Sequence, residues 1–162
     1  MTREGDHTQR PSEETLDALS RIVGEYHAIR DPAAMASYLV EWRDRYVGKA
    51  ALVLQPGSTA EVAAILKRAN ETRTAIVPQG GNTGLAGGQI PHHNEIVLSL
   101  NRMTAIRAID PITNTITVEA GATLQRVRDA AAEADRLYPQ LLPSEGSCTI
   151  GGNLSTNAGG TA

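Results

Sequence analysis

Glycine is concentrated in two short segments of this 162-residue chain. Residues 80–88 contain five glycines in "GGNTGLAGG", and residues 146–160 contain five more in "GSCTIGGNLSTNAGG", out of fifteen in the chain. Glycine loses more conformational freedom on folding than any other residue. A folded chain keeps such clusters where the backbone needs a positive φ, or where another group approaches it closely. The fold must therefore explain both segments.

The first glycine cluster follows a strand–helix–strand pattern. Residues 50–56 are an apolar run stopped by proline, and residues 74–78 are a second run that we expect to be a buried strand. Between them, Ser58 and Glu61 have the spacing of a capping box, which opens a helix. The apolar stripe of this helix is expected to consist of Val62, Ile65, Leu66 and Ala69. The pattern predicts a parallel, right-handed βαβ unit that ends at the first cluster.

The rest of the chain reads as alternating helices and strands. The helix N-terminal signals predict helices over residues 12–22 and 31–38. A strand is predicted over residues 95–100, a hairpin over 104–121 with its turn at 110–114, and a helix over 123–137. Residues 1–11 are expected to be a disordered tail. The predicted fold class is mixed α/β (α+β).

Composition narrows the class of protein. The net charge of −3 argues against a general electrostatic grip on nucleic acid. Cys148 is the only cysteine, so an internal disulfide is impossible, and no apolar run approaches the length of a transmembrane segment. We expect a cytoplasmic protein without a transmembrane segment or a nucleic-acid partner.

The glycine clusters have the composition of an anion-binding loop pair. A loop after a parallel strand lies at the carboxyl end of the sheet, where α/β proteins usually bind ligands. Successive glycines let main-chain N–H groups converge on a phosphate, and a helix N-terminus near Gly151 could add more. Neither cluster contains lysine, which excludes the GxxxxGK[ST] nucleotide loop, and GxGxxG is absent. The two glycine clusters therefore predict a ligand that contains a diphosphate.

Taken together, "PQGGNTGLAGG" and "EGSCTIGGNLSTNAGG" resemble the two cofactor loops of the FAD-binding domain of the vanillyl-alcohol oxidase/PCMH superfamily. The segments "YVGKAALVLQPGSTAEVAAILKRANE", "EIVLSLNRM" and "ITVEAGATL" are similar to the same domain, so the resemblance extends from Tyr46 to the last residue. The chain most resembles the FAD-linked D-2-hydroxy-acid dehydrogenases, namely D-2-hydroxyglutarate dehydrogenase, D-lactate dehydrogenase and the FAD subunit of glycolate oxidase. This implies a PCMH-type FAD-binding fold whose first, βαβ-containing lobe is complete and whose second lobe is truncated.

The resemblance also implies which residues bind FAD. The first loop would wrap the pyrophosphate, with Pro78 shaping its entry, and the second loop would lie along the ribityl chain and the isoalloxazine ring. Some members attach FAD to a histidine directly after the paired glycines; here Asn82 holds that position, which implies non-covalent FAD. Residues 140–144 depart from the family pattern and are not assigned. The implied cofactor residues are Pro78, Gly80, Gly81, Asn82, Thr83, Gly84, Gly146, Ser147, Gly151, Gly152, Asn153, Thr156 and Asn157.

The implied activity is oxidation of a D-2-hydroxy acid to a 2-oxo acid by hydride transfer to flavin N5. Catalytic residues and metal ligands of the family belong to later segments, so none is implied here. We expect residues 1–45 to be a tail with helices and residues 46–162 to be an FAD-binding domain that is incomplete at its C-terminus. By itself it should bind FAD weakly or not at all, and should not turn over a 2-hydroxy acid. The alternatives are a non-catalytic remnant or interaction module, and a binding protein for another diphosphate nucleotide.

Three further features favour structural interpretations. Adjacent side chains rarely reach one metal ion, so His92 and His93 are expected in a solvated loop. Cys148 is expected to be a small buried residue rather than a nucleophile. Residues 41–49, "EWRDRYVGK", are predicted to be a solvated segment, with a contact to phosphate or a neighbouring domain as the alternative.

Overall fold

The computed structural model describes residues 10–160, which divide into two compact units. Of these described residues, 10–79 and 84–99 form the first unit, and 80–83 and 100–160 form the second. The expected disordered tail lies almost entirely outside the described residues. The predicted domain boundary between residues 45 and 46 falls inside the first unit and stays a prediction.

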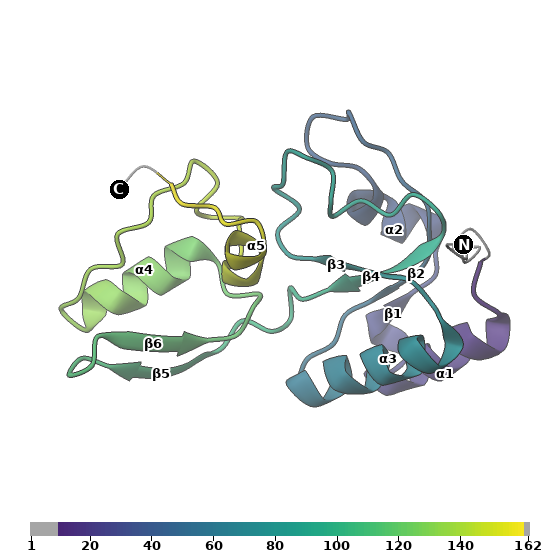
Figure 1. Ribbon diagram of the computed structural model, residues 1–162, viewed down its shortest axis with the longest axis horizontal. Coiled ribbons are helices and arrows are strands. Elements are labelled where there is room, and N and C mark those ends of the chain that lie inside the picture. The colour runs from purple at the N-terminus through teal and green to yellow at the C-terminus, as the bar shows by residue number, and fades with distance from the viewer. Residues whose placement is uncertain (1–9, 161–162) are drawn as a thin grey trace, which may run out of the picture. The chain divides into compact units, whose positions relative to one another are not determined.

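A four-stranded sheet organises the first unit (Figure 1). Its order is β1 (Ala28–Ile29), β2 (Ala50–Leu54), β4 (Glu95–Ser99), β3 (Ile76–Gln79). Both β2 and β3 run parallel to β4, and β1 runs antiparallel to β2. The predicted parallel arrangement of the βαβ strands is confirmed, although β4 lies between them.

The position of β3 corrects one expectation. Residues 74–78 were expected to form a buried strand, but β3 is an edge strand and Pro78 is exposed. The central place belongs to β4, whose residues 96–99 are buried. An edge tolerates proline because its missing N–H leaves no ladder bond broken.

Three helices cover the two faces of this sheet (Figure 1). On one face, Met35 of α2 (Pro32–Leu39) packs against Val53 and Val97, which are paired in register. On the other face, α1 (Glu13–Val23) and α3 (Thr59–Thr72) lie side by side. The short 3-10 helix η1 (Glu25–His27) connects α1 to β1.

The start of α3 has the predicted capping box. The Ser58 hydroxyl accepts the N–H of Glu61 at 3.2 Å, and the Glu61 carboxylate accepts the N–H of Gly57 at 2.8 Å. The predicted stripe is correct for Ile65 and Ala69, which are buried, but wrong for Leu66, which is 47% exposed. Leu66 lies one residue beyond Ile65, about 100° around the helix, and so leaves the packed face.

The second unit is built from a hairpin and two helices. Strands β5 (Ile106–Asp110) and β6 (Thr115–Val118) pair antiparallel around the predicted turn. The Asp110 carboxylate accepts the N–H groups of Ile112 and Thr113, which fixes the turn as residues 110–114. Helix α4 (Leu124–Glu133) and the short α5 (Ile150–Ser155) complete the unit.

The core of the second unit brings distant segments together. Leu124 and Val127 of α4 pack with Cys148 and Ile150, and the β6 side chains Ile116 and Val118 lie against them. Cys148 is 3% exposed, as expected of a small buried residue.

One further prediction, the end of helix α4, is corrected by the structure. The helix predicted over residues 123–137 ends at Glu133, because the N–H of Arg136 turns back to the Ala131 carbonyl and Asp135 takes a left-handed conformation (φ 54°). The mixed α+β fold class is confirmed. Within residues 10–160, no helix is both long and apolar enough to cross a membrane.

Candidate functional site

The two glycine clusters meet inside the second unit. A Cβ atom at Gly81 would overlap the carbonyl oxygen of Ser147, and one at Gly80 would overlap the Thr149 hydroxyl. Neither glycine has a positive φ. Close approach, rather than an unusual backbone angle, is therefore what requires glycine at these two positions.

The left-handed position in the first loop belongs to Asn82, with φ 54°. Asparagine tolerates this conformation better than most side chains. Four main-chain N–H groups of the loop donate to no main-chain carbonyl within residues 10–160, and these are the groups of Gly80, Gly81, Thr83 and Gly84. The loop thus retains donors that an anion could accept.

Thr149 is a candidate that the sequence interpretation did not include. It precedes α5 as the N-cap residue, but its side chain makes no capping hydrogen bond. Its hydroxyl is buried against Gly80 and has no hydrogen-bond partner among the described residues. A buried hydroxyl without a partner is costly in a folded protein. The sequence does contain a signal for Thr149: it directly precedes "IGG", at a position where threonine commonly caps a helix.

The start of α5 offers fewer donors than the sequence suggested. The N–H of Ile150 donates to the Ala122 carbonyl, and the N–H of Gly151 donates to the Ala120 carbonyl, each at 2.9 Å. A Cβ at Gly151 would come within 2.7 Å of the Ala120 Cβ. Gly151 thus serves close packing, and its amide is already used.

The other predicted residues of the second loop divide into packed and open positions. Gly146 and Ser147 are exposed, and a Cβ at Gly146 would meet open space. A Cβ at Gly152 would make only an ordinary contact with Thr149. The Thr156 hydroxyl donates back to the Gly152 carbonyl at 2.9 Å. Only part of this loop is therefore committed to internal contacts.

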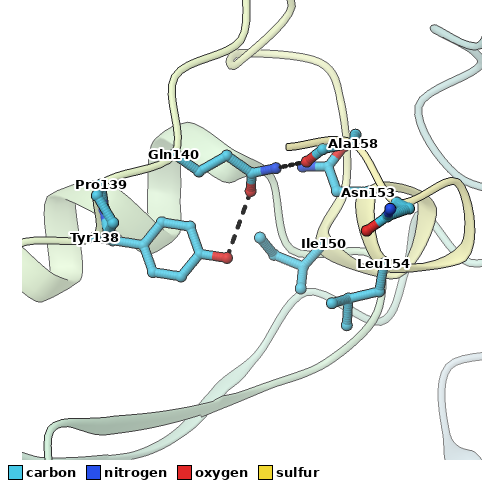
Figure 2. A pocket seen from close by; sticks show the side chains of 8 residues that line it. Tyr138, Pro139, Gln140, Ile150, Asn153, Leu154 and Ala158 are labelled. Carbon is cyan, nitrogen blue, oxygen red and sulfur yellow. Dashed lines mark hydrogen bonds between the residues drawn. The ribbon is translucent and has the colours of Figure 1, made fainter. Parts of the chain in front are cut away.

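A cavity of about 310 Å³ lies beside the second loop (Figure 2). Asn153 and Asn157, both predicted cofactor residues, line it together with the apolar side chains of Ile150 and Leu154. Asn153 is 8% exposed, and its amide group donates to the Cys148 sulfur at 3.6 Å. The remaining lining residues are Tyr138, Pro139, Gln140 and Ala158.

Gln140 links the irregular segment before the loop to the end of the loop. Its side-chain amide donates to the Ala158 carbonyl, and its Oε1 accepts the Tyr138 hydroxyl at 3.5 Å, as Figure 2 shows. The sequence interpretation left Gln140 unassigned. The structure places it on the same cavity as Asn153 and Asn157.

The continuation of the first loop belongs to the first unit. Gly84 is braced by Gln89, whose amide donates to the Gly84 carbonyl at 2.9 Å. The buried Gln79 donates to the carbonyls of Tyr38 and Gln89 at 2.9 and 3.0 Å. These two amides anchor the strand end and the loop that follows it.

Residues 41–46 support the same loop. The expectation of a solvated segment over residues 41–49 is correct for its exposed side chains, among them Trp42 and Lys49, but wrong for Glu41. Glu41 is fully buried and accepts the N–H groups of Arg43 and Arg45 at 3.0 and 2.9 Å. Arg43 in turn donates to the Leu85 carbonyl, and a Cβ at Gly87 would meet the Tyr46 ring. Burial raises the pKa of Glu41, but these N–H donors and the Arg43 guanidinium outweigh burial and hold the pKa below its ordinary value of 4.5.

Comparison with known proteins gives consistent matches. Residues 50–162 match the family described as "FAD binding domain". The chain is 41% identical over 143 residues to the D-2-hydroxyglutarate dehydrogenase of Xanthomonas citri pv. viticola, which covers 88% of this chain and 30% of that protein. It is 38% identical over 156 residues to a protein of Schizosaccharomyces pombe named as a mitochondrial D-lactate dehydrogenase, covering 92% of this chain and 30% of the relative.

Solved structures share the fold at lower identity. An alkyldihydroxyacetonephosphate synthase superposes with a TM-score of 0.82 and 19% identity, over 99% of this chain and 35% of that one. A p-cresol methylhydroxylase superposes with a TM-score of 0.73 and 19% identity, over 87% of this chain and 28% of that one. The chain thus spans about a third or less of the length of these proteins.

Proposed function

Because this chain belongs to the FAD binding domain family, we propose that it is the FAD-binding part of a flavin-dependent oxidoreductase that oxidises a D-2-hydroxy acid to a 2-oxo acid. FAD is accordingly its cofactor. The observation that carries the proposal is the packing of Gly80 and Gly81 against residues 147–149, which joins the two glycine loops within one unit.

The residues present fit a diphosphate. The N–H groups of the first loop that donate to no main-chain carbonyl within residues 10–160 are neutral donors of the kind that bind phosphate oxygens. Because Gly80 and Gly81 have no Cβ, their main chain is open to close approach. The buried Thr149 hydroxyl, which has no hydrogen-bond partner among the described residues, lies next to Gly80. We propose that residues 80–84 bind the diphosphate of FAD and that FAD is held non-covalently.

The cavity beside the second loop is suited to a planar, partly polar ring. Ile150 and Leu154 offer apolar surface, whereas Asn153, Asn157 and Gln140 offer amide groups. Sites for cofactors typically combine apolar walls with a few polar groups in this way. We propose that these side chains bind and orient the isoalloxazine side of the cofactor.

The substrate class rests on the relatives. Proteins named as D-2-hydroxyglutarate and D-lactate dehydrogenases share 37–42% identity with this chain. FAD, when bound, supplies the two-electron acceptor for such an oxidation. This chain supplies cofactor binding and orientation, and we assign none of its residues a catalytic role. We expect no turnover of D-2-hydroxyglutarate or D-lactate by the 162-residue chain alone.

The test is a titration of the purified chain with FAD, followed by flavin fluorescence. We expect weak, saturable binding that Thr83→Asp weakens at least tenfold, because the added carboxylate would repel the diphosphate. The control, Thr117→Asp, adds the same charge at an exposed position of β6 and should leave the affinity unchanged. Equal effects of the two substitutions would contradict the proposed site. A folded wild-type chain that does not bind FAD would show that the two glycine loops are not sufficient for binding by themselves.

The compartment is a separate part of the proposal. We propose a cytoplasmic location, which the single cysteine supports, although several relatives are named as mitochondrial. Cell fractionation with an antibody against the native protein would distinguish the two compartments.

A further inference from the structure

A second cavity, of about 330 Å³, lies in the first unit at the amino ends of β3 and β4. Three segments line it: the start of α1, the turn after α3 at residues 72–75, and residues 93–95 at the start of β4. The rise of a strand places this end about 13 Å from Gln79, where β3 ends. The cavity is therefore distinct from the part of the first unit that leads into the glycine loop.

The lining of this cavity is polar and carries more positive than negative charge. Two arginines, Arg10 and Arg73, line the cavity together with one acidic residue, Glu95. The Glu95 carboxylate already accepts the N–H of His93 at 2.5 Å. The remaining side chains include the hydroxyls of Ser12 and Thr15. The two arginines outnumber the one glutamate, so the lining favours an anion.

Arg73 is the most unusual residue of the group. It ends α3 in the left-handed conformation, with φ 52°, at a position where glycine or asparagine is usual. Its guanidinium forms no ion pair within residues 10–160. An arginine at this position therefore costs backbone energy, and no ion pair of its side chain within residues 10–160 offsets that cost.

Arg10 is available for the same ligand. It pairs with Glu13 at 3.3 Å, but both side chains are more than 60% exposed, and such pairs are weak. Glu13 also faces Arg30 at 3.6 Å, so it keeps a partner if Arg10 turns into the cavity. Glu13 and Glu14 do not line the cavity.

A hydroxyl donor completes the set. The Ser12 oxygen accepts the main-chain N–H of Thr15 at 3.3 Å and lies 3.0 Å from the Thr15 hydroxyl. If Thr15 donates in that second contact, the Ser12 proton is left to point at a ligand.

We propose that this cavity binds a small oxyanion of the phosphate class, held by Arg73, Arg10 and Ser12. Guanidinium groups bind phosphate oxygens in a bidentate fashion. The volume exceeds that of a phosphate ion and is at the lower end for organic ligands. Free phosphate and the phosphate of a small monoester share this chemistry, so both belong in the test.

The decisive variant is Arg73→Gly, since glycine suits the left-handed turn and should leave folding intact. The melting temperature is measured against phosphate concentration at constant ionic strength, with chloride as the reference salt. Phosphate stabilises many proteins by exclusion from their surface, so the informative quantity is the difference between variants. We expect a saturable rise for the wild type and for Lys67→Gln, an exposed cation on the same helix, and loss of the saturable part in Arg73→Gly.

A parallel titration with glycerol phosphate distinguishes the two sources. Tighter binding than inorganic phosphate identifies a phosphate monoester as the ligand, and equal or weaker binding identifies free phosphate. Equal responses of wild type and Arg73→Gly, or no saturable response in the wild type, would overturn the proposal. FAD binding by Arg73→Gly should match the wild type, which keeps this site separate from the proposed cofactor site.

Discussion

Gly81 illustrates how a single residue joins two distant segments of the second unit. A Cβ at this position would overlap the Ser147 carbonyl, which is main chain and cannot rotate away. At Gly146, in the second loop, a Cβ would meet nothing within 4 Å. A side chain larger than hydrogen therefore fits at position 146 but not at position 81.

We predict that Gly81→Ala destabilises the chain by about 1–3 kcal/mol, the usual cost of overpacking. Gly146→Ala, the matched control, should stay within about 0.5 kcal/mol of the wild type. Urea denaturation of both variants measures these differences. Equal stability of the two variants would mean that the glycine loops do not pack as described.

Glu41 carries a pH-dependent contribution to stability. Its pKa is lowered in the folded chain by the N–H donors of Arg43 and Arg45, against the opposing effect of burial. A lowered folded-state pKa stabilises the protein above the unfolded value of 4.5, and that stabilisation is lost as the pH falls through the folded pKa.

Glu41→Gln should therefore lower the melting temperature at pH 7, and the deficit should narrow as the pH drops below 4.5. Thermal melts at pH 7, 5 and 4 measure it, with exposed Glu133→Gln as the control. A deficit that does not change with pH would show that shape, rather than charge, is what the segment requires.

At the scale of elements, α3 depends on its N-terminal cap. The Ser58 hydroxyl accepts the N–H of Glu61, and the Glu61 carboxylate accepts the N–H of Gly57. Ser58→Ala should cost about 1 kcal/mol, whereas Ser58→Asp, which keeps an acceptor, should cost little. The midpoint of urea unfolding measures both. If aspartate fails to preserve stability, the capping hydrogen bond is not the reason for serine at this position.

At the scale of the whole molecule, the two units have separate cores. Val53 belongs to the core of the first unit and Leu124 to that of the second, and both are fully buried. The four residues Gly80–Thr83 group with the second unit, although the chain on both sides of them belongs to the first.

We predict that Leu124→Ala, which should cost about 2–5 kcal/mol, speeds amide hydrogen exchange in residues 100–160 and in the loop at 80–83. Val53→Ala should act on β2 and β4 instead. Mass spectrometry of exchanged peptides resolves these segments. Faster exchange of the loop with Val53→Ala alone would assign it to the first unit.

The sequence by itself determined the features that depend on near neighbours. The capping box at Ser58, the hairpin turn at Asp110 and the approximate ranges of most helices and strands follow from interactions within a few residues. The glycine clusters likewise identified the family. Tertiary structure alone decided that β4 separates β2 from β3, that Glu41 is buried, and that Thr149 lies unpaired beneath Gly80. These outcomes depend on which distant segments pack together, and local periodicity carries no information about that choice.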